Sequence, residues 1–97
     1  MKPVCLVLGA GAGIGGTVAK KFAIEGYHSC LCRRSDQRGL DKLVSNIEEA
    51  GGSASGYLIN AIEDNVLEDL IINIEKDVGP IEVLVYNLGA QTGMKLL

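Results

Sequence analysis

A cluster of glycines follows the first apolar run of the chain, and its spacing is suited to binding a phosphate. The run covers residues 4–8, and the glycines begin at Gly9 and recur as far as Gly16. Glycine lets the backbone turn sharply off a strand and leaves no Cβ between the backbone amides and a pyrophosphate. Amides at the start of a following helix, with the positive end of its dipole, attract an anion. The sequence therefore predicts a strand, a phosphate-binding turn and a helix.

Two glycine spacings fit this turn. The spacing G-x-x-x-G-x-G fits Gly9, Gly13 and Gly15 directly behind the apolar run. The spacing G-x-G-x-x-G fits only from Gly11 to Gly16, which requires the strand to extend two residues further. Glycine turns also occur in proteins that bind nothing, so the position of this turn between a strand and a helix is what favours a nucleotide site.

Two arginines end the second apolar run. The run covers residues 28–32, and Arg33 and Arg34 follow it. In dinucleotide-binding folds an acidic residue at this place accepts hydrogen bonds from the ribose 2′-hydroxyl of NAD, whereas an arginine pairs with the 2′-phosphate of NADP. A guanidinium group can also stack on adenine. We therefore expect NADP(H) to be favoured over NAD(H), and a solvated arginine pair at a strand end is the alternative.

The rest of the chain predicts strands alternating with helices. Short connections between such elements imply a parallel sheet with right-handed crossovers, an α/β architecture with the expected strand order 3-2-1-4. A loop is expected from Leu88 onward. The predicted strands cover residues 4–8, 28–32, 55–59 and 81–87, and the helices run from the glycine turn to Gly26, from Ser35 or Asp36 to Gly51, and from about Glu63 to Val78.

Length and composition restrict the functions open to the chain. Its 97 residues have room for one small domain, residues 1–97. Apolar residues make up 47% of the chain and charged residues 22%, and the formal net charge is −3, so we expect neither nucleic-acid nor membrane binding. No apolar stretch approaches a membrane span and no signal peptide precedes the first strand, so we expect a cytoplasmic protein.

The sequence positions of the three cysteines and the one histidine indicate structural roles for them. Cys5, Cys30 and Cys32 lie inside predicted strands, and none forms a C-x-x-C pair or lies near a histidine at metal-ligand spacing. We expect buried thiols and no metal site. His28 begins the second predicted strand without an acidic or nucleophilic neighbour, so we expect it to be structural.

Two motifs resemble those of the short-chain dehydrogenase/reductase family. The spacing of Gly9, Gly13 and Gly15 is similar to that of the family, and residues 84–89, L-V-Y-N-L-G, resemble its L-V-N-N-A-G. Residues 79–82 supply the glycine, isoleucine and acidic residue that the family commonly has before this motif. The resemblance spans nearly all 97 residues. It implies a partial NAD(P)-binding Rossmann domain, a three-layer parallel sheet of about four strands and three helices.

The resemblance also implies contacts around the adenine. The family usually places an aspartate against the adenine amine after the third strand, and this chain has Asn60 and Ala61 there. An asparagine can still accept a hydrogen bond through its oxygen. Ala12 stands where NADP-dependent members have an additional basic residue, so that contact with the 2′-phosphate is absent.

The fourth-strand motif departs from that of the family at two places. Tyr86 and Leu88 replace an asparagine and an alanine, which implies a bulkier wall beside the nicotinamide ribose. Asn87 and Gly89 match, and Asn87 is expected to stabilise the sheet on the cofactor side. The cofactor-binding residues that we expect are Gly9, Ala12, Gly13, Ile14, Gly15, Arg33, Arg34, Asn60, Ala61, Asn87, Leu88 and Gly89.

No catalytic residue is expected in this chain. Carbonyl or alcohol chemistry in the family uses a tyrosine acid/base, a lysine four residues later and a serine. None of the three tyrosines here is followed by a lysine at that distance. We interpret the chain as the N-terminal cofactor-binding half of an NADP(H)-dependent oxidoreductase, inactive in hydride transfer by itself.

Two other functions are open. A non-catalytic interaction module could pair with another copy or with a full-length homologue through the apolar edge at residues 83–85, which would also make the domain marginally stable and prone to aggregate. An S-adenosylmethionine-dependent methyltransferase also has a glycine turn after its first strand. It normally has an acid where this chain has Arg33 and Arg34.

Overall fold

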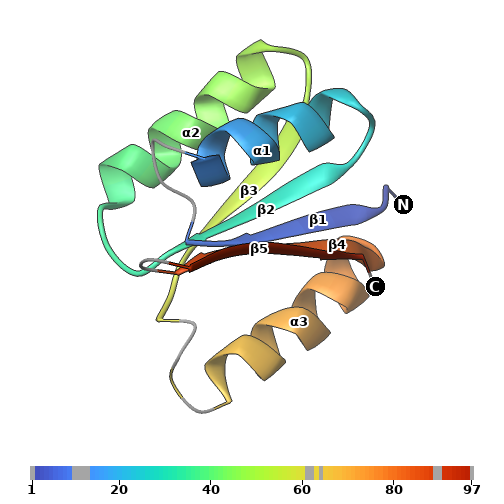
Figure 1. Ribbon diagram of the computed structural model, residues 1–97. Coiled ribbons are helices and arrows are strands. Elements are labelled where there is room, and N and C mark those ends of the chain that lie inside the picture. The colour runs from blue at the N-terminus through green and yellow to red at the C-terminus, as the bar shows by residue number, and fades with distance from the viewer. Residues whose placement is uncertain (1, 10–13, 61–62, 64, 89–90, 97) are drawn as a thin grey trace.

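The chain folds into one sheet with helices on both faces (Figure 1). The computed structural model describes residues 2–9, 14–60, 63, 65–88 and 91–96. Its elements are β1 (Val4–Leu8), α1 (Ile14–Ile24), β2 (His28–Arg33), α2 (Gln37–Glu49), β3 (Ser53–Leu58), α3 (Val66–Asp77), β4 (Ile81–Leu88) and β5 (Gln91–Leu96). Figure 1 shows α1 and α2 on one face of the sheet and α3 on the other.

The first four strands form a parallel sheet of Rossmann type. β1 lies between β2 and β4, and β3 pairs with the other side of β2, all in parallel. The sheet order is β3-β2-β1-β4-β5. The predicted order 3-2-1-4 with three helices is therefore confirmed. From β1 the chain adds strands first on one side, to β3, and then on the other, to β4. The crevice at the carboxyl ends of β1 and β4 is therefore the topological switch point, where sheets of this type bind ligands.

Side chains of the central strands alternate between two apolar layers. All residues of β1 are buried, as expected for a parallel strand covered on both faces. The layer against α1 and α2 includes Cys5, Val7, Leu31, Leu40 and Ile47, and the layer against α3 includes Leu6, Leu8, Cys30, Cys32 and Ile74.

Helix ends follow the predicted local signals. Gly26 has φ 104, a left-handed conformation that favours glycine, two residues beyond the end of α1. Asp36, one of the two predicted caps, begins α2, and its carboxylate accepts from the Gly39 amide at 3.0 Å. α3 begins at Val66, three residues later than predicted, with Asn65 at its N-cap position but without a side-chain capping bond.

The prediction of a loop after Leu88 is wrong. Residues 91–96 form β5, which pairs antiparallel with β4 along Val83 to Leu88. The apolar edge expected to be free at residues 83–85 is therefore covered by the chain itself. The physical reason is the unpaired row of amides and carbonyls on β4, together with a connection only two residues long, the commonest length for a β-hairpin.

The thiols are buried, as predicted. Burial raises the pKa of Cys5 to about 12, that of Cys30 to about 11 and that of Cys32 to about 12. A thiol with so high a pKa stays protonated at neutral pH and is a poor nucleophile or metal ligand. Over the part of the chain that the structure describes, no three His, Cys, Asp or Glu residues are grouped to hold a metal ion.

His28 connects the edge strand β3 to β2. Its Nδ1 lies 3.0 Å from Ser53 Oγ and its Nε2 lies 2.8 Å from Ser55 Oγ. The Lys2 ammonium also donates to Ser53 Oγ at 3.3 Å. Both ring nitrogens are thus occupied by hydroxyls of the neighbouring strand, in keeping with a structural role. This pairing also explains why β3 begins at Ser53 and not at the predicted Ser55.

We expect the stability of the fold to fall in mild acid because of His28. Burial, and secondly the charge of Lys2, lower the pKa of His28 below its usual 6.5. The unfolded state therefore binds more protons, so the stabilisation is present above about pH 6.5 and is lost as the pH falls through the lower, folded-state value. Urea unfolding of wild type and His28→Asn between about pH 8 and pH 5 measures this loss, since asparagine does not titrate there. Parallel stability curves for the two proteins would contradict the assignment.

Candidate cofactor-binding site

Those predicted site residues that the structure describes lie at the carboxyl edge of the sheet. β1 ends beside Cys32 of β2 and Tyr86 of β4. The Gly9 amide donates to the Cys32 carbonyl at 2.9 Å, and the Ile59 amide donates to the Arg33 carbonyl at 2.8 Å. These bonds place the start of the glycine turn next to the arginine pair, with the segment after β3 on the far side of that pair. The carboxyl edge of a parallel sheet is where α/β proteins bind their ligands.

The glycine turn begins with a backbone conformation that favours glycine. Gly9 has φ 78, in the left-handed region. Gly15 is buried in the first turn of α1, which begins at Ile14 and has no acidic residue in that turn. A helix start without a carboxylate is suited to an anion. Ala12 and Gly13, also predicted to bind the cofactor, lie outside the described residues.

Arg33 lies across the first turn of α2. Its Nη2 pairs with Asp36 Oδ2 at 3.5 Å, and the exposed fractions of the two side chains are 23% and 54%. A Cβ built on Gly39 would collide with both the Asp36 carboxylate and the Arg33 guanidinium. The glycine is therefore required for this close approach. Sequence reasoning selected Asp36 only as a cap and did not select Gly39, although an aspartate three residues before a glycine is a signal for such a turn.

Arg34 differs from Arg33 because it is exposed and unpaired. Within the described ranges, the structure gives the Arg34 guanidinium no ion pair and no side-chain hydrogen bond. The arginine pair therefore presents one free guanidinium and one that already has an anionic partner.

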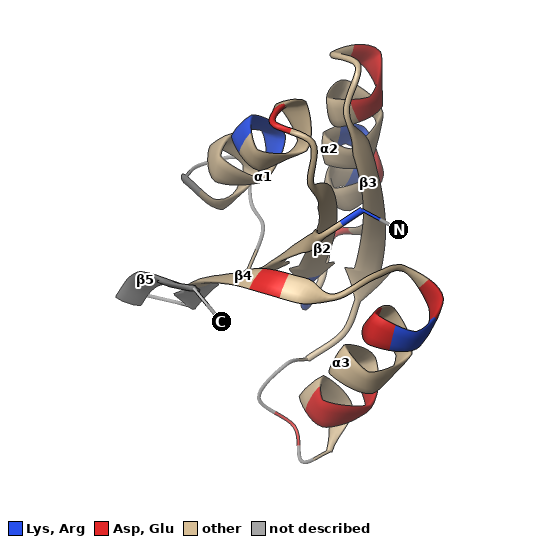
Figure 2. Ribbon diagram, turned by 90° about the vertical axis from the view of Figure 1, so that its right-hand side faces the viewer, with Lys and Arg blue, Asp and Glu red and all other residues tan. Residues whose placement is uncertain are grey.

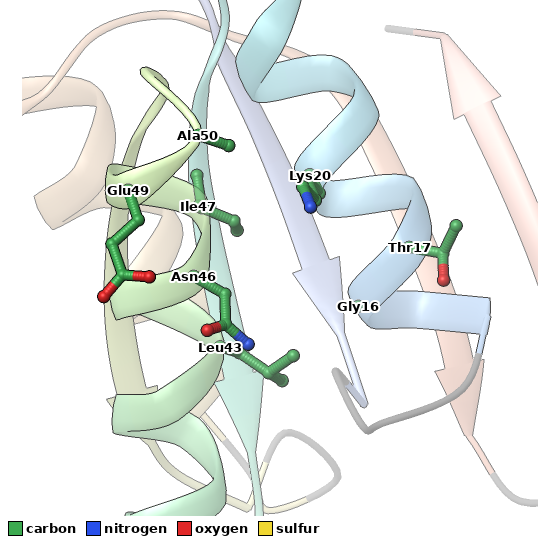
Figure 3. Close-up of a pocket in the computed structure, with 8 residues that line it drawn as sticks. All are labelled: Gly16, Thr17, Lys20, Leu43, Asn46, Ile47, Glu49 and Ala50. Carbon is green, nitrogen blue, oxygen red and sulfur yellow. The ribbon is translucent and has the colours of Figure 1, made fainter.

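A hollow of about 300 Å³ lies beside the paired arginine. It is lined by the Arg33–Asp36 pair, Gly39 and residues of the following two turns of α2, among them Lys42. It adjoins a groove of about 430 Å³ between α1 and α2, since Asn46 lines both. Figure 3 shows Gly16 and Lys20 on the side of α1 that faces Asn46 across this groove, with Glu49 further along α2. The hollow is thus the end of the groove nearer to the arginine pair.

The opposite face of the sheet is unsuited to a phosphate. α3 has four acidic residues and one lysine in its sequence V-L-E-D-L-I-I-N-I-E-K-D. Figure 2 shows these acidic residues along α3, whereas the lysines of α1 lie on the other side of the sheet. The distribution of charge therefore favours an anion on the side of α1 and α2.

The remaining predicted residues lie at the ends of β3 and β4. Asn60 directly follows the segment paired to Arg33, and its Nδ2 donates to Glu63 Oε1 at 3.3 Å. Sequence reasoning did not select Glu63. Asn87 and Leu88 are the last residues of β4 and pair with Thr92 and Gln91 of β5. The predicted residues Ala61 and Gly89 lie outside the described ranges.

Comparison with known proteins identifies the class to which this fold and site belong. The family model described as short chain dehydrogenase matches residues 3–96. The chain therefore belongs to the short-chain dehydrogenase family, which confirms the resemblance of its glycine turn and fourth strand.

Individual relatives agree with this membership. The chain is 37% identical over 86 residues to gluconate 5-dehydrogenase of Gluconobacter oxydans, covering 89% of this chain and 33% of that protein. It is 35% identical over 86 residues to a fatty acyl-CoA reductase of Acinetobacter baylyi, covering 89% of this chain and 29% of that protein. This chain spans about a third of the length of the curated relatives it matches.

Solved structures confirm the fold. A short-chain dehydrogenase from Rhodopseudomonas palustris superposes with a TM-score of 0.82 at 34% identity, covering 92% of this chain and 41% of that one. An actinorhodin polyketide ketoreductase solved with NADPH has a TM-score of 0.81 at 33% identity, covering 90% of this chain and 33% of that one. No helix in the part of the chain that the structure describes is long and apolar enough to cross a membrane.

Proposed function

We propose that this chain is the cofactor-binding portion of a short-chain dehydrogenase/reductase and that it binds NADP(H) in preference to NAD(H). One observation carries the proposal. The Gly9 amide donates to the carbonyl of Cys32, directly before Arg33 and Arg34, so the start of the glycine turn lies beside the backbone of the two arginines at one edge of the sheet. A ribose 2′-phosphate attached to a dinucleotide on that turn needs cations at this place.

The residues of this chain fit a dinucleotide along the carboxyl edge. Glycines from Gly9 to Gly15, with Ala12 and Ile14, let the pyrophosphate approach the start of α1, whose amides and dipole hold its charge. Arg34 binds the 2′-phosphate, since its guanidinium has no partner among the described residues. When bound, the nicotinamide of such a cofactor carries a hydride to or from a carbonyl or alcohol carbon.

Two further groups of residues belong to the proposed cofactor site. Asn60, with Ala61, is proposed to contact the adenine, to which an amide can donate or from which it can accept a hydrogen bond. Asn87 and Leu88, the last two residues of β4, are proposed with Gly89 to contact the nicotinamide side of the cofactor.

Two solved relatives support the choice of cofactor. The ketoreductase described above was solved with NADPH, and a metagenomic short-chain oxidoreductase, 27% identical with a TM-score of 0.78, was solved in complex with NADP. The names of the curated relatives differ in substrate, from gluconate to fatty acyl-CoA, so the proposal is restricted to the cofactor.

The proposal includes neither catalysis by the chain alone nor a substrate. None of the tyrosines among the 97 residues is followed four residues later by lysine, so we propose that hydride transfer requires residues beyond those of this sequence. We also propose that residues 1–97 form one domain and that the protein is cytoplasmic.

The two alternative functions are not retained. Pairing with another chain through the edge of β4 is excluded because β5 covers that edge. A methyltransferase is not retained either, because the chain belongs to a dehydrogenase family.

Calorimetric titration of the purified chain with NADPH and NADH in parallel tests the proposed function. We expect saturable binding of both cofactors, with NADPH the tighter. A chain that is folded by circular dichroism and binds neither dinucleotide would overturn the proposal.

A further inference from the structure

Asp36 has two roles at the start of α2. Its Oδ1 accepts from the Gly39 amide at 3.0 Å, which caps the helix, and its Oδ2 pairs with Arg33 Nη2 at 3.5 Å. The capping bond fixes the carboxylate, and the absence of a Cβ at Gly39 leaves room for the guanidinium against it. The Asp36 carboxylate therefore already pairs with Arg33 at the place where the proposed function puts the ribose 2′-phosphate.

We propose that Asp36 weakens the preference for NADP(H) over NAD(H), because it competes with the ribose 2′-phosphate for Arg33 and repels that phosphate. This inference rests on the proposed binding of a dinucleotide. Asp36 acts as a positioning residue through Arg33, and Arg34 is left as the principal partner of the phosphate.

The charges around Arg33 explain the competition. A 2′-phosphate carries close to two negative charges and three acceptor oxygens, so it is a stronger partner for a guanidinium than one carboxylate is. When Arg33 turns towards the phosphate, the Asp36 carboxylate loses its partner and lies beside a second anion. Lys42 lines the same hollow and offsets part of this repulsion. NADH has no 2′-phosphate, so it meets no such competition.

Asp36→Asn removes the charge and keeps the cap. An asparagine side chain retains an oxygen that can accept from the Gly39 amide, and asparagine tolerates the left-handed conformation that Asp36 adopts, φ 70 and ψ 69. The matched control is Asp41→Asn. Asp41 lies on the same helix, is exposed and accepts from Gln37 Nε2 at 2.8 Å, so its replacement changes the net charge equally without touching Arg33.

The experiment measures the dissociation constants of NADPH and NADH for wild type and both variants by calorimetry at about pH 8, where the phosphate is a dianion. We expect Asp36→Asn to bind NADPH about three- to tenfold more tightly, as expected from removing one charge close to the phosphate in a largely solvated site. We expect no tighter binding of NADH, and a change within about twofold for both cofactors in Asp41→Asn.

A double-mutant cycle tests whether the effect passes through Arg33. In an Arg33→Gln background, Asp36→Asn should give less than half of the tightening that it gives alone, because no guanidinium is left to release. Equal effects of Asp36→Asn and Asp41→Asn, or an undiminished effect without Arg33, would overturn the inference while leaving dinucleotide binding in place. Failure of the folded wild type to bind either cofactor would overturn the proposed function and this inference with it.

Discussion

Arg34→Asp should reverse the cofactor preference of the chain. The Arg34 guanidinium is exposed and unpaired within the described ranges, so it can bind a 2′-phosphate without breaking another contact. Replacement loses a charge-assisted hydrogen bond and places a carboxylate beside the phosphate. We expect the affinity for NADPH to fall about ten- to hundredfold, whereas NADH binds equally well or better. Parallel calorimetric titrations with the two cofactors measure this change.

The control for this prediction is Arg38→Asp, which changes the net charge by the same amount. Arg38 is an exposed residue inside α2, whereas Arg34 directly follows β2 at the carboxyl edge of the sheet. We expect its replacement to leave the ratio of the two affinities within about twofold of the wild-type ratio, because charge at a distance is screened by salt. Loss of NADPH preference in both variants would mean that net charge, and not a contact from Arg34, sets the preference.

Leu31→Ala should remove a large part of the stability of the fold. Leu31 has 0% exposure at the centre of β2, in the apolar layer against α1 and α2. Truncation of a buried leucine loses its transfer free energy and leaves a cavity, at a cost of about 2–5 kcal/mol. Domains of this size are stable by about 5–15 kcal/mol in all. Urea unfolding followed by circular dichroism should show a much lower midpoint with a similar slope.

Leu58→Ala is the matched control, because it makes the same substitution on the neighbouring strand β3. Leu58 is 45% exposed, so its truncation removes less buried surface and leaves no closed cavity. We expect a loss of about 1 kcal/mol or less. Equal losses in the two variants would contradict the two-layer arrangement of the core.

The parts of the fold that local sequence rules determine could be predicted. The glycine turn, the end of β2 at the arginines and the stop at Gly26 each depend on a few neighbouring residues whose conformational preferences are strong. The alternation of strands with helices predicts parallel strands with right-handed crossovers, and the strand order follows from the Rossmann fold class. These features place Gly9 and Arg33 at the same edge of the sheet, so the approximate position of the site could be predicted from the sequence.

The parts that depend on contacts between distant residues could not be predicted. Residues 91–96 contain Gly93 and Lys95 and have little strand pattern of their own, so their pairing depends on the edge that β4 offers. The bonds of His28 to Ser53 and Ser55 depend on the register between β2 and β3, which the sequence leaves open. The Arg33–Asp36 pair is a local contact, but it occurs with Asp36 in a left-handed conformation that is uncommon for residues other than glycine and that the sequence does not specify.

Alkylation of the buried thiols can report when the helices separate from the sheet. Cys5 lies on one side of the sheet, and Cys30 and Cys32 lie on the other. With pKa values raised to about 11 or 12 and no access from water, none can react with an alkylating reagent until its layer separates. The order in which the three become alkylated therefore records which covering layer separates first, α1 with α2 or α3, and whether a bound dinucleotide keeps it closed.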